Sequence, residues 1–85
     1  MAWQWQITPG AIKLMKRLPK DVRERIVKKL DFWVSSGAPL RFAETLTNYE
    51  LGSYRFRVGD YRVSFDVQGE TIVILKVGHR REIYK

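Results

Sequence analysis

Cysteine is absent from this chain of 85 residues, which excludes disulfide bonds and thiolate metal sites and suits a reducing compartment. A single histidine, His79, argues against most zinc sites. No apolar run approaches the roughly 20 residues that a membrane span requires, and the N-terminus lacks the order of a secretion signal. G-x-G-x-x-G, Walker A and H-E-x-x-H motifs are also missing. We therefore expect a soluble cytoplasmic protein with no metal and no nucleotide cofactor.

Acidic residues are in the minority, with nine Asp and Glu against sixteen Lys and Arg and a net charge of +7. A basic excess of this kind favours a polyanionic partner such as a nucleic acid. Hydrophobic residues make up 45% of the chain, which is typical of a folded domain and too high for a disordered tail. A chain of this length builds one core, so we expect a single domain over residues 1–85.

Hydrophobic periodicity predicts an α+β domain with the element order β-α-α-β-β-β, in which a mainly antiparallel sheet packs on a helical hairpin. Alternating apolar residues indicate strands, and apolar residues three and four apart indicate helices. The predicted strands cover residues 3–7, 54–58, 61–67 and 71–77, and the predicted helices cover residues 9–18 and 19–34.

Proline and turn residues separate these elements. Thr8 can cap the first helix and Pro9 can open it, while Pro19 ends the first helix and opens the second. Residues 38–52 have no clear period, so we expect a long connection there. The last strand, an apolar run, is predicted to be buried on both faces. A short basic tail, residues 79–85, follows it.

Glycines mark the connections between the last three strands. Gly59-Asp60 fits a two-residue hairpin loop, and Gln68-Gly69-Glu70 fits the next turn. Gly78 is predicted to end the last strand.

The first of these loops would bring arginines together. The opposed pairs would be Val58 with Tyr61, Arg57 with Arg62, and Arg55 with Ser64. A three-residue second turn would also place Lys76 opposite Arg62. Like charges opposed across a sheet are destabilising by up to about 1 kcal/mol. An anion with several oxygens would relieve the repulsion, and the planar fork of arginine suits phosphate.

The alternative interpretation is a solvated sheet face that keeps a small basic protein soluble. We favour a phosphate cradle, because Asp66 is the only acid expected near the three arginines. The basic residues of the two helices are more typical of a solvated face that steers the protein toward RNA. The spacing of Trp3, Trp5 and Trp33 assigns these tryptophans to the core.

The basic tail adds two cations and two side chains that can exchange protons. Arg80 and Arg81 extend the cationic surface. His79 and Tyr84 are possible proton carriers, although a lone histidine or a C-terminal tyrosine more often has only a structural role.

Two segments of the chain carry a family resemblance. The segment YRFRVGDYRV (residues 54–63) and the segment IVILKVGHRREIY (residues 72–84) resemble the RelE branch of the RelE/ParE toxin superfamily. The match includes a Y-R-x-R-x-G-D-Y-R hairpin and a V-G-H-R-x-x-x-Y ending. The resemblance extends over nearly the whole chain, apart from residues 38–52.

The resemblance implies the toxin of a type II toxin-antitoxin pair, an endoribonuclease that cuts messenger RNA in the ribosomal A site. It implies a RelB-like antitoxin that neutralises the toxin, and operator DNA as a partner only through the toxin-antitoxin complex. It also implies catalytic roles for basic residues on the strands and for a C-terminal arginine and tyrosine. The residues at those places are Arg55, Arg57, Arg62, Arg80 and Tyr84.

Such a reaction needs no metal, because the 2′-hydroxyl of the RNA attacks the adjacent phosphorus and leaves a 2′,3′-cyclic phosphate. Cations would stabilise the phosphoryl oxygens, and we expect Lys76 and Arg81 to add RNA contacts. Well-known relatives carry lysines at the places of Arg55 and Arg57, and arginine does not act as a base. The general base is therefore open between His79 and Tyr84.

Two other functions remain open. The first is a ParE-like toxin that binds DNA gyrase and catalyses no reaction, and the second is a relic that binds RNA or ribosomes without cutting. The retained arginine and tyrosine of the C-terminal ending favour the nuclease.

Overall fold

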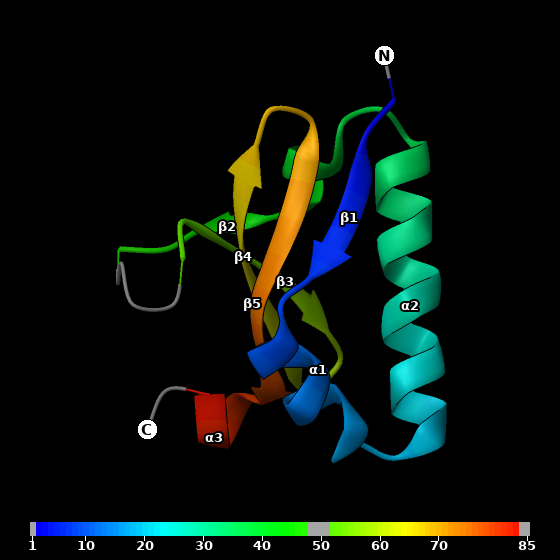
Figure 1. Ribbon diagram of the computed structural model, residues 1–85, viewed down its shortest axis with the longest axis vertical. Coiled ribbons are helices and arrows are strands. Elements are labelled where there is room, and N and C mark those ends of the chain that lie inside the picture. The colour runs from blue at the N-terminus through cyan, green and yellow to red at the C-terminus, as the bar shows by residue number, and fades with distance from the viewer. Residues whose placement is uncertain (1, 48–51, 84–85) are drawn as a thin grey trace.

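The computed structural model describes residues 2–47 and 52–83 and confirms the predicted α+β fold. Its sheet has the strand order β1-β5-β4-β3-β2, and α1 and α2 follow β1 along the chain (Figure 1). The elements are β1 (Gln4–Ile7), α1 (Pro9–Lys16), α2 (Lys20–Ser35), the 3-10 turn η1 (Pro39–Phe42), β2 (Glu44–Thr45), β3 (Tyr54–Val58), β4 (Tyr61–Gln68), β5 (Thr71–His79) and α3 (Arg80–Ile83).

The two long helices begin where the sequence predicts. The hydroxyl of Thr8 accepts a hydrogen bond from the backbone N–H of Ala11 at 3.3 Å, and Pro9 is the first residue of α1. Pro19 precedes α2, and Gly37, with φ of 80°, follows its last turn. No helix in the described ranges is long and apolar enough to cross a membrane.

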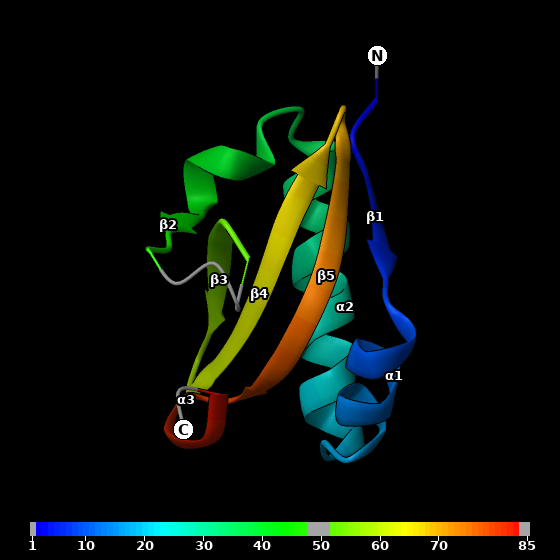
Figure 2. The same cartoon turned by 60° about the vertical axis from the view of Figure 1, so that its left-hand side comes forward.

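The strands form one mixed sheet. β3, β4 and β5 are antiparallel neighbours, whereas β1 pairs with β5 in parallel. Figure 2 shows β4 and β5 side by side, with β1 along the other edge of β5. The connection over residues 38–52 was expected to carry no regular element. It contains η1 and the two-residue strand β2, which are too short to produce a hydrophobic period.

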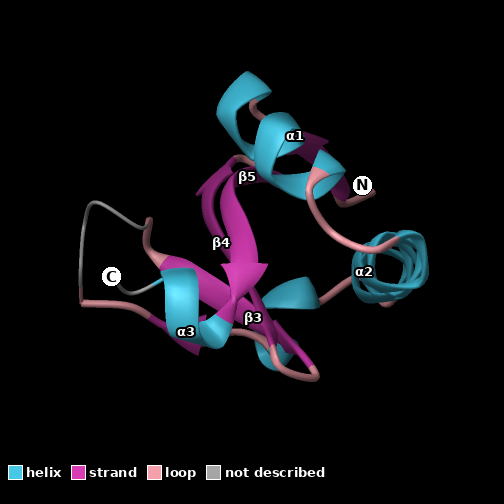
Figure 3. Cartoon of the chain, turned by 90° about the horizontal axis from the view of Figure 1, so that it is seen from below, coloured by secondary structure: helices cyan, strands magenta, loops and turns pink. Residues whose placement is uncertain are grey.

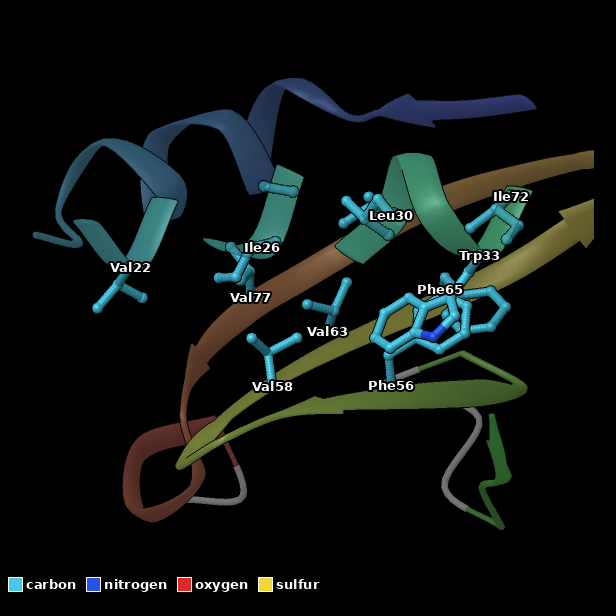
Figure 4. Packing of buried hydrophobic residues seen from close by; sticks show 12 residues of the cluster. Val22, Ile26, Leu30, Trp33, Phe56, Val58, Val63, Phe65, Ile72 and Val77 are labelled. Carbon is cyan, nitrogen blue, oxygen red and sulfur yellow. The ribbon is translucent and has the colours of Figure 1, made fainter. Parts of the chain in front are cut away.

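The core lies between α2 and one face of the sheet (Figure 4). The ring of Trp33 stacks on Phe56 at 4.1 Å between centroids, and Phe56 stacks on Phe65 at 4.4 Å. Trp3 and Trp5 are only half-buried and lie at the margin of this core. Aromatic stacking thus couples the C-terminal half of α2 to the middle of the sheet.

β5 departs from the sequence prediction in three ways. Its burial alternates, so it is not buried on both faces. It continues through Gly78 to His79 instead of ending at Gly78, and the tail that follows begins as α3. The turn before it has two residues, Gly69 and Glu70, because Gln68 already pairs with Thr71.

Candidate functional site

One face of the sheet carries the predicted cluster of arginines. Arg57 pairs with Arg62 across β3 and β4, and Arg55 pairs with Ser64, as the turn at Gly59-Asp60 predicts. We call the face that bears Arg55, Arg57 and Arg62 the arginine face. Figure 3 shows α2 on one side of the sheet and α3 on the other. The core therefore occupies the face toward α2, and the arginine face is the face toward α3.

Glu44 is a carboxylate on the arginine face that the sequence analysis missed. It pairs with Arg55 in register, and its carboxylate binds the guanidinium of Arg55 at 3.0 Å and that of Arg57 through its second oxygen. The hydrogen bond from Arg55 lowers the pKa of Glu44, desolvation opposes this shift, and the neighbouring arginine charges reinforce it. Glu44 is thus an internal anion between two arginines.

The expectation that Asp66 is the only acid near the three arginines was therefore wrong. Asp66 accepts a hydrogen bond from the backbone N–H of Ser53 at 2.7 Å, and Glu44 is the acid that contacts the guanidinium groups. Glu44 comes from a two-residue strand inside an aperiodic segment. No periodic signal in the sequence could have placed it there.

Arg62 differs from the other arginines because it is almost buried, with 7% of its surface exposed. Its Nη1 donates hydrogen bonds to the backbone oxygens of Gly59 at 2.8 Å and Tyr61 at 2.9 Å. Gly59 lies in the β3–β4 turn, and Tyr61 is the first residue after it. The guanidinium is thus directed toward the turn, and its charge satisfies backbone acceptors there.

Lys76 lies on the arginine face because of a shift in strand register that the sequence did not predict. It pairs with Ser64, so the expected position opposite Arg62 was wrong, and Gly78 lies there instead. The register shifts by one residue next to Ser64 and Phe65. Without that shift, the two-residue turn would place Lys76 on the core face, since neighbouring residues of a strand alternate between faces.

His79 lies away from the arginines. It pairs with Tyr61, and the two rings contact edge to face at 5.5 Å between centroids. Tyr61 alternates with Arg62 along β4, so the register puts His79 on the opposite face from Arg62. Its Nδ1 accepts a hydrogen bond from the backbone N–H of Arg81 at 3.1 Å. The structure therefore does not bring His79 together with the arginine cluster.

Arg80 joins the site from the other end of the chain. Its backbone N–H donates to the backbone oxygen of Asp60 at 2.8 Å, and its Nε lies 3.8 Å from the Asp60 carboxylate. Arg81, the next residue of α3, is exposed. Tyr84 lies outside the described residues. The β3–β4 turn is thus contacted by both Arg62 and Arg80.

The arginine face retains an excess of positive charge. Among the described residues of its strands, three arginines and Lys76 share it with two carboxylates, Glu44 and Asp66, and the latter is engaged by a backbone N–H. The side chains of Arg57 and Arg80 are more than half exposed, at 59% and 53%. These two guanidinium groups can contact a phosphate without a change of fold.

Comparisons with known proteins identify relatives over almost the whole chain. The family described as "ParE toxin of type II toxin-antitoxin system, parDE" matches residues 6–84. Toxin RelE3 of Methanocaldococcus jannaschii is 32% identical over 79 residues, which cover 86% of this chain and 85% of that protein. Toxin RelG of Mycobacterium tuberculosis is 31% identical over 87 residues, which cover 100% and 99%.

A solved structure of similar fold also comes from a toxin-antitoxin system. The solved toxin-antitoxin complex RelBE2 of Mycobacterium tuberculosis matches with a TM-score of 0.80 and 25% sequence identity. The match covers 94% of this chain and 100% of the chain in that structure.

Proposed function

Because the chain belongs to the RelE/ParE toxin superfamily, in its RelE-like branch, we propose that it is an endoribonuclease that cuts messenger RNA in the ribosomal A site. The chain is a toxin of a type II toxin-antitoxin system. The observation that carries the proposal is the direct opposition of Arg57 and Arg62 on a sheet face with excess positive charge. Such an arrangement suits a bound phosphodiester.

In the proposed reaction, the 2′-hydroxyl of one nucleotide attacks the adjacent phosphorus and its oxygen forms the new P–O bond. The bond from phosphorus to the 5′-oxygen breaks, which leaves a 2′,3′-cyclic phosphate and a 5′-hydroxyl. A base takes the 2′ proton, and an acid supplies a proton to the leaving oxygen. No oxidant, reductant or metal is needed to balance this step.

The exposed arginines have the clearest part in this reaction. Negative charge grows on the phosphoryl oxygens in the transition state, and fixed cations stabilise it there. Arg57 and Arg80 are exposed enough to do this, and Lys76 and Arg81 add contacts to the RNA strand. Tyr84 is the proposed proton carrier, and His79 is the less favoured one because of its place on the other face.

Glu44 gives the site a specific property in the absence of RNA. Its carboxylate binds two guanidinium groups of the proposed site, those of Arg55 and Arg57. A phosphodiester must displace or share this carboxylate to bind Arg55 and Arg57. Ribosome dependence fits such a site, because the ribosome would supply the in-line geometry and additional contacts that free RNA lacks.

The proposed protein partner is a RelB-like antitoxin, since the similar RelBE2 structure is a toxin-antitoxin complex. Operator DNA would be bound only through that complex. A gyrase-binding role is the second candidate, because the matching family is described as a ParE toxin.

The test is addition of purified protein to a translation reaction, followed by mapping of message ends. We expect cuts within translated codons, with cyclic phosphate at the 3′ ends, and Arg80→Ala should remove most of them. A parallel assay follows supercoiling by gyrase. Intact messages together with blocked supercoiling would replace the nuclease by the gyrase poison, and intact messages with ribosome binding alone would indicate a non-cutting relic.

A further inference from the structure

The β3–β4 turn, Gly59-Asp60, collects contacts from two arginines of the proposed site. Arg62 donates from Nη1 to the carbonyl of Gly59 and to that of Tyr61, at 2.8 and 2.9 Å. Arg62 is almost buried, so solvent competes little for these charge-assisted bonds. Arg62, a residue of the arginine face, therefore stabilises the turn.

The same turn also contacts Arg80, through Asp60. The backbone N–H of Arg80 donates to the carbonyl of Asp60 at 2.8 Å, which fixes the start of α3 against the hairpin. The Asp60 carboxylate lies 3.8 Å from Nε of Arg80. A long, exposed side chain such as Arg80 has many rotamers, and a carboxylate beside Nε leaves the terminal N–H groups available to another anion.

We propose that Asp60 is a positioning residue for Arg80, and that Arg62 acts by fixing the turn that carries Asp60. This inference rests on the proposed cleavage of RNA, in which Arg80 contacts the phosphate. Arg62 contributes to the turn through its Nη1, which donates to both carbonyls.

A purely structural role for the Asp60 carboxylate does not fit its surroundings. The side chains of Asp60 and Arg80 are 67% and 53% exposed, and an exposed ion pair at this distance contributes little to stability. Loss of the carboxylate should therefore leave the fold intact. A small displacement of a group that binds the reacting phosphate can nevertheless reduce the rate strongly.

The chain offers a matched control. Gly69-Glu70 is the other two-residue turn that begins with glycine and ends with an acid, and it closes the opposite end of β4. Both Asp60→Asn and Glu70→Gln remove one negative charge from a turn. Among the described residues, Glu70 makes no ion pair, so only Asp60→Asn alters a contact to the site.

The experiment measures ribosome-dependent cleavage by the full chain, with melting temperatures as a check on folding. We expect Asp60→Asn to lower kcat about tenfold with little change in KM, and Glu70→Gln to cut at the parental rate. Asp60→Glu should restore part of the rate. Equal rates for Asp60→Asn and Glu70→Gln, with parental cleavage intact, would refute the positioning role.

A double-mutant cycle separates positioning from a general effect of charge. In the Arg80→Ala background, Asp60→Asn should reduce the residual rate no further, because the residue it positions is gone. Independent, multiplicative losses would overturn the inference. If the parent protein cuts no message on the ribosome, the proposed function itself fails, and this outcome is distinct from the other two.

Discussion

At the scale of single residues, Glu44 changes how the arginine cluster is understood. One carboxylate from β2 binds two guanidinium groups of β3, those of Arg55 and Arg57. The two groups are therefore ordered without a ligand, and the repulsion between neighbouring arginines is partly offset. A pair of ordered side chains loses less conformational entropy on binding than two independent side chains would.

This pairing makes stability depend on pH. The pKa of Glu44 is lowered in the folded state by the hydrogen bond from Arg55, so its contribution is present above the unfolded pKa near 4.5 and is lost as pH falls through the folded pKa. We expect Glu44→Gln to destabilise slightly at pH 7 and less at pH 3. Urea unfolding at both pH values measures this, with Glu70→Gln as control. An equal loss at both pH values would contradict it.

His79 provides a second prediction at this scale. Because it lies beside Tyr61 on the face away from Arg62, His79→Ala should cleave messages at close to the parental rate across pH 5 to 8. The measurement is the pH dependence of single-turnover cleavage on the ribosome. A variant whose profile has lost one limb would instead show that His79 carries a proton in the reaction.

At the scale of elements, the two glycine turns of β4 can be compared directly. Gly59 and Gly69 both have φ of 61°, which is strained for any residue with a Cβ. A Cβ at Gly59 would lie 3.2 Å from Nη1 of Arg25 on α2, whereas a Cβ at Gly69 would meet nothing within 4 Å. Both turns therefore require a positive φ at the glycine, but only at Gly59 does another side chain lie close to an added Cβ.

We predict that Gly59→Ala and Gly69→Ala each destabilise the protein by about 1 to 2 kcal/mol, since the exposed end of Arg25 can move aside. Denaturant unfolding of both variants measures the two losses. Only Gly59→Ala should also slow cleavage, because its turn carries Asp60. A loss at Gly59 that exceeds the loss at Gly69 severalfold would show that Arg25 is held rigidly there.

Short elements also explain which parts of the architecture the sequence could predict. The helices and the long strands have enough residues for a hydrophobic period to appear. β2 has two residues and η1 has four, so neither produces a period. The register shift in β5 is a second case, because a bulge depends on how the strand fits its neighbours.

At the scale of the whole molecule, one core connects the helices to the sheet that carries the site. Ile26 of α2 and Phe65 of β4 are both fully buried. We expect Ile26→Ala and Phe65→Ala to cost about 2 to 5 kcal/mol of unfolding free energy, a large share of the total for a small domain. Chemical denaturation measures the cost, and Ile12→Ala, at a residue 38% exposed, is the control with a small effect. Comparable losses at Ile12 and Ile26 would contradict this assignment of the core.

The sequence by itself determined the opposition of Arg57 and Arg62. Alternation along two strands and a two-residue turn are local properties, and together they leave one register that buries the apolar residues. It determined the order of the main elements for the same reason.

Only the tertiary structure decided which groups join these arginines. Glu44, Lys76 and Arg80 reach their places through contacts between segments distant in the chain or through an irregular register. Such contacts depend on how whole elements pack against each other. Local patterns of hydrophobicity do not determine that packing. The partners of the arginines can therefore be identified only in the folded structure.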